Sequence, residues 1–122
     1  MAKRDTTAVT VVLIDPLGRT VTSMEHDGSA GRSEQLVQTP FPSETHWGKD
    51  TLVYDENGEF RPDTGVFSLA GFPEPFLYGR VLLIGMCEGQ VTTPTRGIEE
   101  VRQSVQWHDL TDPPERARIG IE

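Results

Sequence analysis

The stretch YGRVLLIG, residues 78–85, constrains the fold of this 122-residue chain more than any other. It holds four consecutive apolar residues, Val81–Ile84, between two glycines. Such a run is much too short to cross a membrane, but it has the length and composition of a strand that is buried on both faces. It therefore predicts a central strand in a sheet that is covered on both sides.

Other β-rich segments supply neighbours for that strand. TAVTVVLID (7–15) and RTVTSMEH (19–26) flank a turn around Asp15-Pro16, which predicts a hairpin. TLVYD (51–55) leads into Asn57-Gly58, a pair that favours a type I′ turn with a returning strand at Glu59. VFSLA (66–70) and QVTT (90–93) are shorter elements, while residues 40–50 show no periodicity and are expected to form a loop.

Two helices are expected. Ser33 can cap a short helix near residues 33–38, which Pro40 ends. Ile98, Val101 and Val105 recur at helical spacing, and Thr93 or Thr95 can cap this second, amphipathic helix. It should pack on the sheet.

The predicted fold class is α+β: a small, mainly antiparallel sheet of about five to six strands with one C-terminal amphipathic helix and a short helix near 33–38. Residues 1–107 are expected to form a single domain, and residues 108–122 an extended C-terminal arm. The last five residues, RIGIE, could add an edge strand within one chain or pair two chains as a homodimer.

The charge of the chain disfavours several partners. Nineteen acidic and eleven basic residues give a formal net charge of −8. A surface of this kind repels phosphate backbones and anionic lipid, so neither direct nucleic-acid binding nor membrane association is expected. The N-terminal apolar run is too short for a signal peptide, which predicts a soluble, cytoplasmic protein. Imitation of DNA by an acidic surface is one open alternative.

No pattern fixes a reaction. The three histidines are far apart in the sequence and no Cys pattern accompanies them, so no metal site is predicted. Cys87 is the only cysteine and is expected to be a structural thiol at the end of a buried strand. No nucleophile elbow, P-loop or dinucleotide fingerprint is present, so neither a catalytic residue nor a cofactor is predicted.

The segment ETHWGK, residues 44–49, combines aromatic and cationic side chains on an expected loop. Such side chains can stack on a base and bind a phosphate. The candidate ligand-binding residues are His46, Trp47, Lys49, Arg61 and Arg80. Alternatively, Trp47 closes the edge of the core while Lys49 and Arg61 are solvated.

The layout of the chain resembles a family of small bacterial proteins of unknown function that phages, plasmids and conjugative elements carry. The likeness covers about residues 8–107 and rests on four segments: VLIDPLG, LVYDENGEF, YGRVLLIG and TTPTRGIEEVRQSV. At the position of the family's Leu-Pro-x-Asn element this chain has RPDTG. The resemblance implies an accessory protein of a mobile element, some of which counter host defence, and it assigns no functional residue.

Together these features predict a small non-enzymatic accessory binding protein of phage or mobile-element origin. Its expected partner is a host protein or a small anionic, nucleotide-type ligand. The alternative from another class is a small hydrolase or nucleotide-modifying enzyme with loop-borne acid–base residues, for which His46, Asp63 and Glu74 are the candidates.

Overall fold

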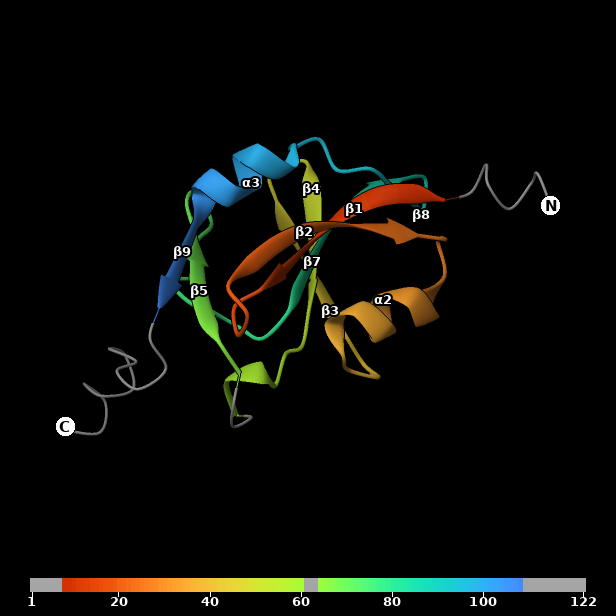
Figure 1. Ribbon diagram of the computed structural model, residues 1–122. Coiled ribbons are helices and arrows are strands. Elements are labelled where there is room, and N and C mark those ends of the chain that lie inside the picture. The colour runs from red at the N-terminus through yellow and green to blue at the C-terminus, as the bar shows by residue number, and fades with distance from the viewer. Residues whose placement is uncertain (1–7, 61–63, 109–122) are drawn as a thin grey trace, which may run out of the picture.

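A six-stranded antiparallel sheet forms the centre of the protein in the computed structural model, which describes residues 8–60 and 64–108 (Figure 1). Its strands lie in the order β2-β1-β7-β4-β3, and β8 pairs with the far end of β7. A second sheet has the order β6-β5-β9. The predicted α+β class and the six-stranded antiparallel sheet are confirmed, whereas the second sheet was not foreseen. The strands are β1 (Val9–Asp15), β2 (Thr20–His26), β3 (Ser43–Trp47), β4 (Asp50–Tyr54), β5 (Val66–Leu69), β6 (Leu77–Tyr78), β7 (Val81–Cys87), β8 (Gln90–Thr92) and β9 (Val105–His108).

Strand β7 is central, as its apolar run predicts. It pairs with β1 on one side and with β4 on the other. Val81 and Leu83 belong to one apolar cluster, and Leu82 and Ile84 belong to the other. Because side chains alternate along a strand, each face of β7 contributes to a different core layer.

The larger core layer lies between the main sheet and a cover made of the second sheet and helix α3 (Ile98–Ser104). Phe67 of β5 and Val101 of α3 are fully buried in this layer. Trp107 of β9 packs against Phe67 with ring centroids 6.1 Å apart. The predicted amphipathic helix is thus confirmed for Ile98 and Val101. It ends at Ser104, and Val105, which was expected on the helix, is instead the first residue of β9.

The opposite face of the main sheet is covered by helix α2 (Ala30–Val37), and Figure 1 shows α2 and α3 on different sides of the sheet. Leu36 and Val37 are the buried residues of α2. The helix begins three residues earlier than expected, because Ser29 rather than Ser33 is its N-cap and accepts a hydrogen bond from the Arg32 amide. Ser33 instead lies within hydrogen-bonding distance of the His26 ring.

Residues 40–50 do not form the expected loop. They contain β3, which pairs with β4 through a two-residue turn at Gly48 and Lys49. Gly48 has a φ of +65°, whereas Lys49 does not have a positive φ, as in a type II′ turn. The sequence of β3, SETHW, has polar residues at every position but the last, so hydrophobic alternation could not reveal it.

The prediction of a type I′ hairpin at Asn57-Gly58 is wrong. After β4 the chain turns into a short 3₁₀ helix, η1 (Gly58–Phe60), and neither residue of the pair has a positive φ. The Asp55 carboxylate accepts a hydrogen bond from the Asn57 amide, which favours this local turn. Both sides of β4 are already paired, with β3 and with β7, so no returning strand can add to it.

Two further expectations concern residues near strand ends. Cys87 is the last residue of β7, as predicted, but its side chain is exposed and not buried. The turn after it has positive φ at both Glu88 and Gly89 and joins β7 to β8, as QVTT predicts. The RIGIE segment and nearly all of the predicted arm lie outside the described residues.

Candidate functional site

The five candidate ligand-binding residues do not form one site. His46 and Lys49 are exposed at the β3–β4 hairpin, whereas Trp47 is only 3% exposed. Arg80 precedes β7 at the opposite end of β4 from Lys49, because Val53 pairs with Leu82 and Thr51 pairs with Ile84. Arg61 lies outside the described residues.

Trp47 belongs to a buried cluster that fastens the β3–β4 hairpin to the loop before α3. The Arg96 guanidinium lies 3.6 Å from the Trp47 ring centroid and donates a 2.6 Å hydrogen bond to the Trp47 carbonyl oxygen. Asp50 is fully buried and accepts hydrogen bonds from the Thr95 amide (2.7 Å) and hydroxyl (3.0 Å) and from the Arg96 amide (3.2 Å). Core residues and Arg96 therefore surround the Trp47 indole, which was predicted as a candidate for stacking on a base.

A different hollow combines aromatic rings with carboxylates. We call it the acidic hollow; its volume is about 290 Å³. It lies where the end of β4, the loop before β6 and β6 itself come together. Its lining residues are Thr45, Tyr54, Asp55, Glu56, Glu59, Phe72, Glu74, Phe76, Leu77 and Tyr78. Four of these ten residues are acidic, four are aromatic and none is basic, so the lining favours a cation.

The surrounding elements hold the rings of the acidic hollow in place. Tyr54 and Phe72 pack against the larger core layer. Phe76 makes an edge-on contact with the His108 ring of β9, with centroids 5.1 Å apart and planes at 83°. Ser68 of β5 lies 3.0 Å from His108 Nε2 and orients that imidazole. The second sheet thus supports one wall of the hollow.

The carboxylates of the acidic hollow make its electrostatic potential negative, and the pKa of Tyr54 reflects this. Burial, and after it the carboxylates of Glu56 and Glu74, raise the pKa of the Tyr54 phenol above its ordinary value of 10.0. Both glutamates are exposed at the rim. A negative potential that disfavours phenolate formation favours a bound cation for the same reason.

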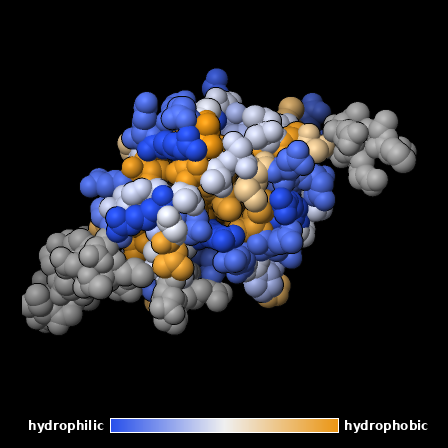
Figure 2. All heavy atoms as spheres, viewed as in Figure 1, coloured by the Kyte–Doolittle hydropathy of each residue, from blue (hydrophilic) through white to orange (hydrophobic). Residues whose placement is uncertain are grey.

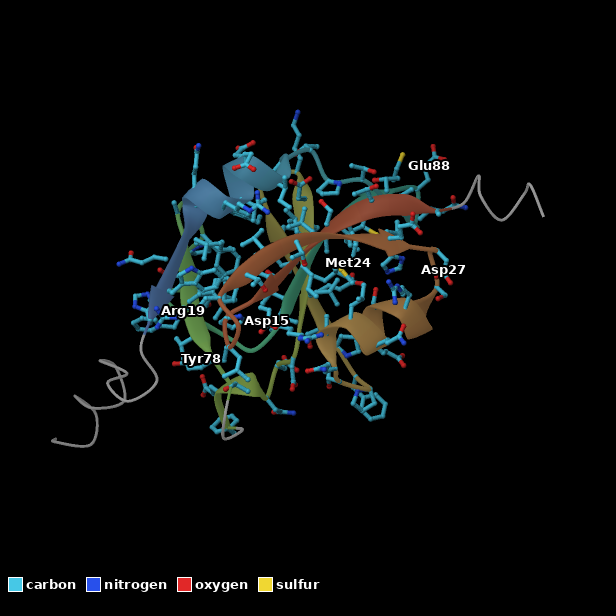
Figure 3. All side chains as sticks on the ribbon, in the orientation of Figure 1. Asp15, Arg19, Met24, Asp27, Tyr78 and Glu88 are labelled. Carbon is cyan, nitrogen blue, oxygen red and sulfur yellow. The ribbon has the colours of Figure 1, made fainter. Side chains whose placement is uncertain are left out.

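A smaller hollow adjoins the acidic hollow. The two share Asp55 and Tyr78, and the smaller one has a volume of about 150 Å³. Arg80 lines it, and one of its nitrogens lies 3.6 Å from the Asp15 carboxylate, while another donates a 3.4 Å hydrogen bond to the Leu36 carbonyl. Figure 3 shows Asp15 and Tyr78 near each other at this end of the sheet. The charge of Arg80 is therefore opposed by a neighbouring carboxylate.

The residues named for the enzyme alternative are not brought together by the described structure. Glu74 lines the acidic hollow, on the same side of the sheet as the Thr45 side chain. Because side chains alternate along β3, the His46 side chain points to the opposite face. Asp63 lies outside the described residues.

Sequence reasoning did not identify the acidic hollow because four separate segments build it. Phe72, Glu74 and Phe76 belong to GFPEPF, which appears in the sequence only as a proline-rich loop. Aromatic residues that alternate with proline and glutamate in one loop were the available signal. Their position opposite Tyr54 depends on the pairing of β6 with β5.

Within residues 8–60 and 64–108, no three His, Cys, Asp or Glu side chains are grouped so that they could hold a metal ion. Neither of the described helices has the length and apolar character needed to cross a membrane. Comparison with protein-family models, with curated proteins and with solved structures finds no match. The predicted membership of a mobile-element family therefore stays a prediction.

Proposed function

We propose that this chain is a small non-enzymatic binding protein whose acidic hollow receives a cationic side chain of a partner protein. The observation that carries the proposal is the lining of that hollow, in which carboxylates and aromatic rings converge from separate elements. Aromatic faces attract cations by about 0.5–2 kcal/mol per contact, depending on exposure, and nearby carboxylates add a charge-assisted hydrogen bond.

The charge of the whole chain supports a basic protein partner. A formal net charge of −8 attracts a basic surface over a distance of about 8–10 Å at physiological salt and raises the rate of encounter. The same field repels a phosphate group. Of the two expected partners, a host protein is therefore favoured over a nucleotide-type ligand.

The origin that we propose is a phage or another mobile element, with antagonism of a host defence system as the biological role. This part rests on the resemblance in layout over residues 8–107. The DNA-mimic alternative requires carboxylates spaced regularly along one face. Grouping of Asp55, Glu56, Glu59 and Glu74 around one hollow favours a side-chain receptor instead.

A pull-down from bacterial lysate, followed by titration against the purified captured protein, tests the proposal. We expect the Glu56→Gln/Glu74→Gln double variant to lose at least about tenfold in affinity, because two charge-assisted contacts disappear. The matched control is Glu25→Gln/Glu88→Gln, which removes two exposed carboxylates outside the hollow.

Three results would count against the proposal. Equal losses in both double variants would show a general charge effect, and unchanged binding in both would place the site elsewhere. Turnover of a nucleotide panel that disappears in His46→Ala would support the enzyme alternative.

A further inference from the structure

Strand β3 has one unpaired side in the described structure. It is the terminal strand of the main sheet and pairs only with β4. Trp47 and Asp50 close the two-residue turn, and the residues that close such a turn are a hydrogen-bonded pair. By alternation, the backbone groups of Glu44 and His46 point away from β4. Both residues are exposed, so these groups are available to an added strand.

The other edge of the same sheet is blocked. On β2, the Val21 carbonyl accepts a 3.0 Å hydrogen bond from Arg102 of α3. The Glu25 carbonyl accepts a 2.9 Å hydrogen bond from Arg32 of α2. Two arginines thus occupy outward-facing carbonyls on β2, and no corresponding contact is found for Glu44 or His46 among the described residues. The two edges differ in their capacity to accept another strand.

A hollow lies on each side of the β3 edge. Thr45 lines the acidic hollow on one face. The adjacent residue, Glu44, lines a hollow of about 490 Å³ on the other face. We call this second one the apolar hollow, since Val53 and Ile84 of the sheet line it together with Phe41, which is 84% exposed. An added strand would direct alternate side chains toward these two hollows.

We propose that the β3 edge binds an extended basic segment of the partner protein by β-strand addition. Backbone hydrogen bonds to Glu44 and His46 supply sequence-independent affinity. A cationic side chain enters the acidic hollow, and the next side chain, an apolar one, contacts the apolar hollow. Charge complementarity selects this occupant, because none of the described residues that line the acidic hollow is basic. The inference rests on the proposed function and adds to it the mode of binding.

The test uses a blocked seven-residue peptide of alternating Arg and Val, with binding to the full chain measured by calorimetry. His46→Pro removes an outward N–H without removing a bond to β4, and we expect it to weaken binding by about tenfold or more. The matched control, Ser23→Pro, removes the equivalent N–H on the blocked β2 edge and should leave the peptide affinity within about twofold. Circular dichroism and an unfolding curve verify that both variants are folded.

A second pair of peptides separates charge from strand pairing. One peptide is N-methylated at every Arg and the other at every Val. Both keep the charge of the parent peptide, but the first lacks the backbone N–H groups of its Arg residues and the second lacks those of its Val residues. We expect one of the two to bind about tenfold more weakly than the parent peptide, because only one set faces β3. Equal binding of all three peptides, or equal affinity of His46→Pro and the unmodified chain, would overturn strand addition.

The same experiments distinguish this inference from the proposed function. If Glu56→Gln/Glu74→Gln weakens binding of the peptide while His46→Pro does not, the hollow is a receptor and strand addition is wrong. Hydrogen exchange of the Glu44 and His46 amides in the peptide-free protein should be fast. Slow exchange would mean that a second copy or another part of this chain already occupies the edge, and a dimer in light scattering would identify the second copy.

Discussion

The guanidinium group of Arg96 stacks on the indole of Trp47 at a distance of 3.6 Å and joins the β3–β4 hairpin to the loop that leads into α3. The same side chain donates to the Trp47 carbonyl and lies 3.3 Å from the fully buried Asp50 carboxylate. These residues are about fifty positions apart in the sequence. The cluster fixes the orientation of the β3–β4 hairpin, and hence of the edge to which we assign partner binding.

Replacement of Asp50 should destabilise the fold strongly. In Asp50→Ala the Thr95 amide and hydroxyl and the Arg96 amide lose their acceptor in a buried setting, so we expect a loss of about 3 kcal/mol in the free energy of unfolding. Chemical denaturation measures this loss. Glu88→Gln, an exposed control, should change the free energy by less than about 0.5 kcal/mol. A similar small change in Asp50→Ala would show that the cluster contributes little.

Gly65 should not tolerate a side chain. A Cβ atom at this position would lie 2.4 Å from the Pro16 carbonyl carbon and 2.6 Å from the Leu17 nitrogen, so Gly65→Ala requires the backbone of the β1–β2 turn to move. We expect a cost of about 3 kcal/mol in thermal or chemical unfolding. Gly31→Ala is the control, because it lies in α2 with open space around it and should stabilise by about 0.5 kcal/mol. Equal stabilities of the two variants would contradict the close approach of β5 to this turn.

His26 should make stability depend on pH. Its Nδ1 accepts a 2.8 Å hydrogen bond from the Gly28 amide, which requires that this nitrogen carry no proton. Burial lowers the pKa of His26 below its ordinary value of 6.5. The Asp27 carboxylate raises this pKa and the positive charge of Arg32 lowers it, but burial is the largest effect. At a pH between the pKa of His26 in the folded state and its pKa in the unfolded state, the unfolded chain binds more protons than the folded chain. The free energy of unfolding should therefore be constant above about pH 7 and fall as the pH decreases through the lowered pKa of the folded state.

Unfolding curves between about pH 5 and 8 test this dependence. His26→Gln should flatten the pH profile, because it removes the imidazole whose pKa is lowered in the folded state. Asp27 does not complicate the comparison, since hydrogen bonds from Ser29 lower its pKa below 3.8. A profile that is equally steep in His26→Gln and the unmodified chain would place the responsible group elsewhere.

The Tyr54 phenol reports the potential of the acidic hollow. Glu74→Gln removes one of the two carboxylates that raise its pKa, so the phenol should titrate at a lower pH than in the unmodified chain. Only part of the shift should disappear, because burial is its largest cause. Ultraviolet absorbance during alkaline titration measures the phenolate, and a Tyr78→Phe background leaves Tyr54 as the chain's only tyrosine. An unchanged titration would indicate that Glu74 is distant from the phenol in solution.

Local sequence signals were sufficient for several elements. The apolar run Val81–Ile84 identified the central strand, and Asp15-Pro16 identified the first hairpin. Helical spacing of apolar residues located α3, which has Glu99 and Glu100 in its first turn. These signals succeed because burial on one or both faces leaves a period in the sequence that depends only on the element itself.

The β3–β4 hairpin and the turn at Asn57-Gly58 show where local signals fail. Strand β3 has a polar sequence and is specified by its pairing with β4, while Asn57-Gly58 had the residues of a hairpin turn but no partner for a returning strand. The helix capping signals also failed, since Thr95 donates to Asp50 and α3 has no side-chain cap. In each case strand pairing or a contact with a distant residue outweighs a local preference.

The sequence by itself determined the α+β class, the central strand, the amphipathic helix and a formal net charge of −8. Tertiary structure decided which strands pair, which edge of the main sheet is unpaired among the described strands and which side chains converge on the acidic hollow. The physical reason is that periodicity and turn residues act over a few positions, whereas a binding site depends on packing between segments. Tyr54 and Phe76 are 22 positions apart and line one hollow only after two sheets have packed together.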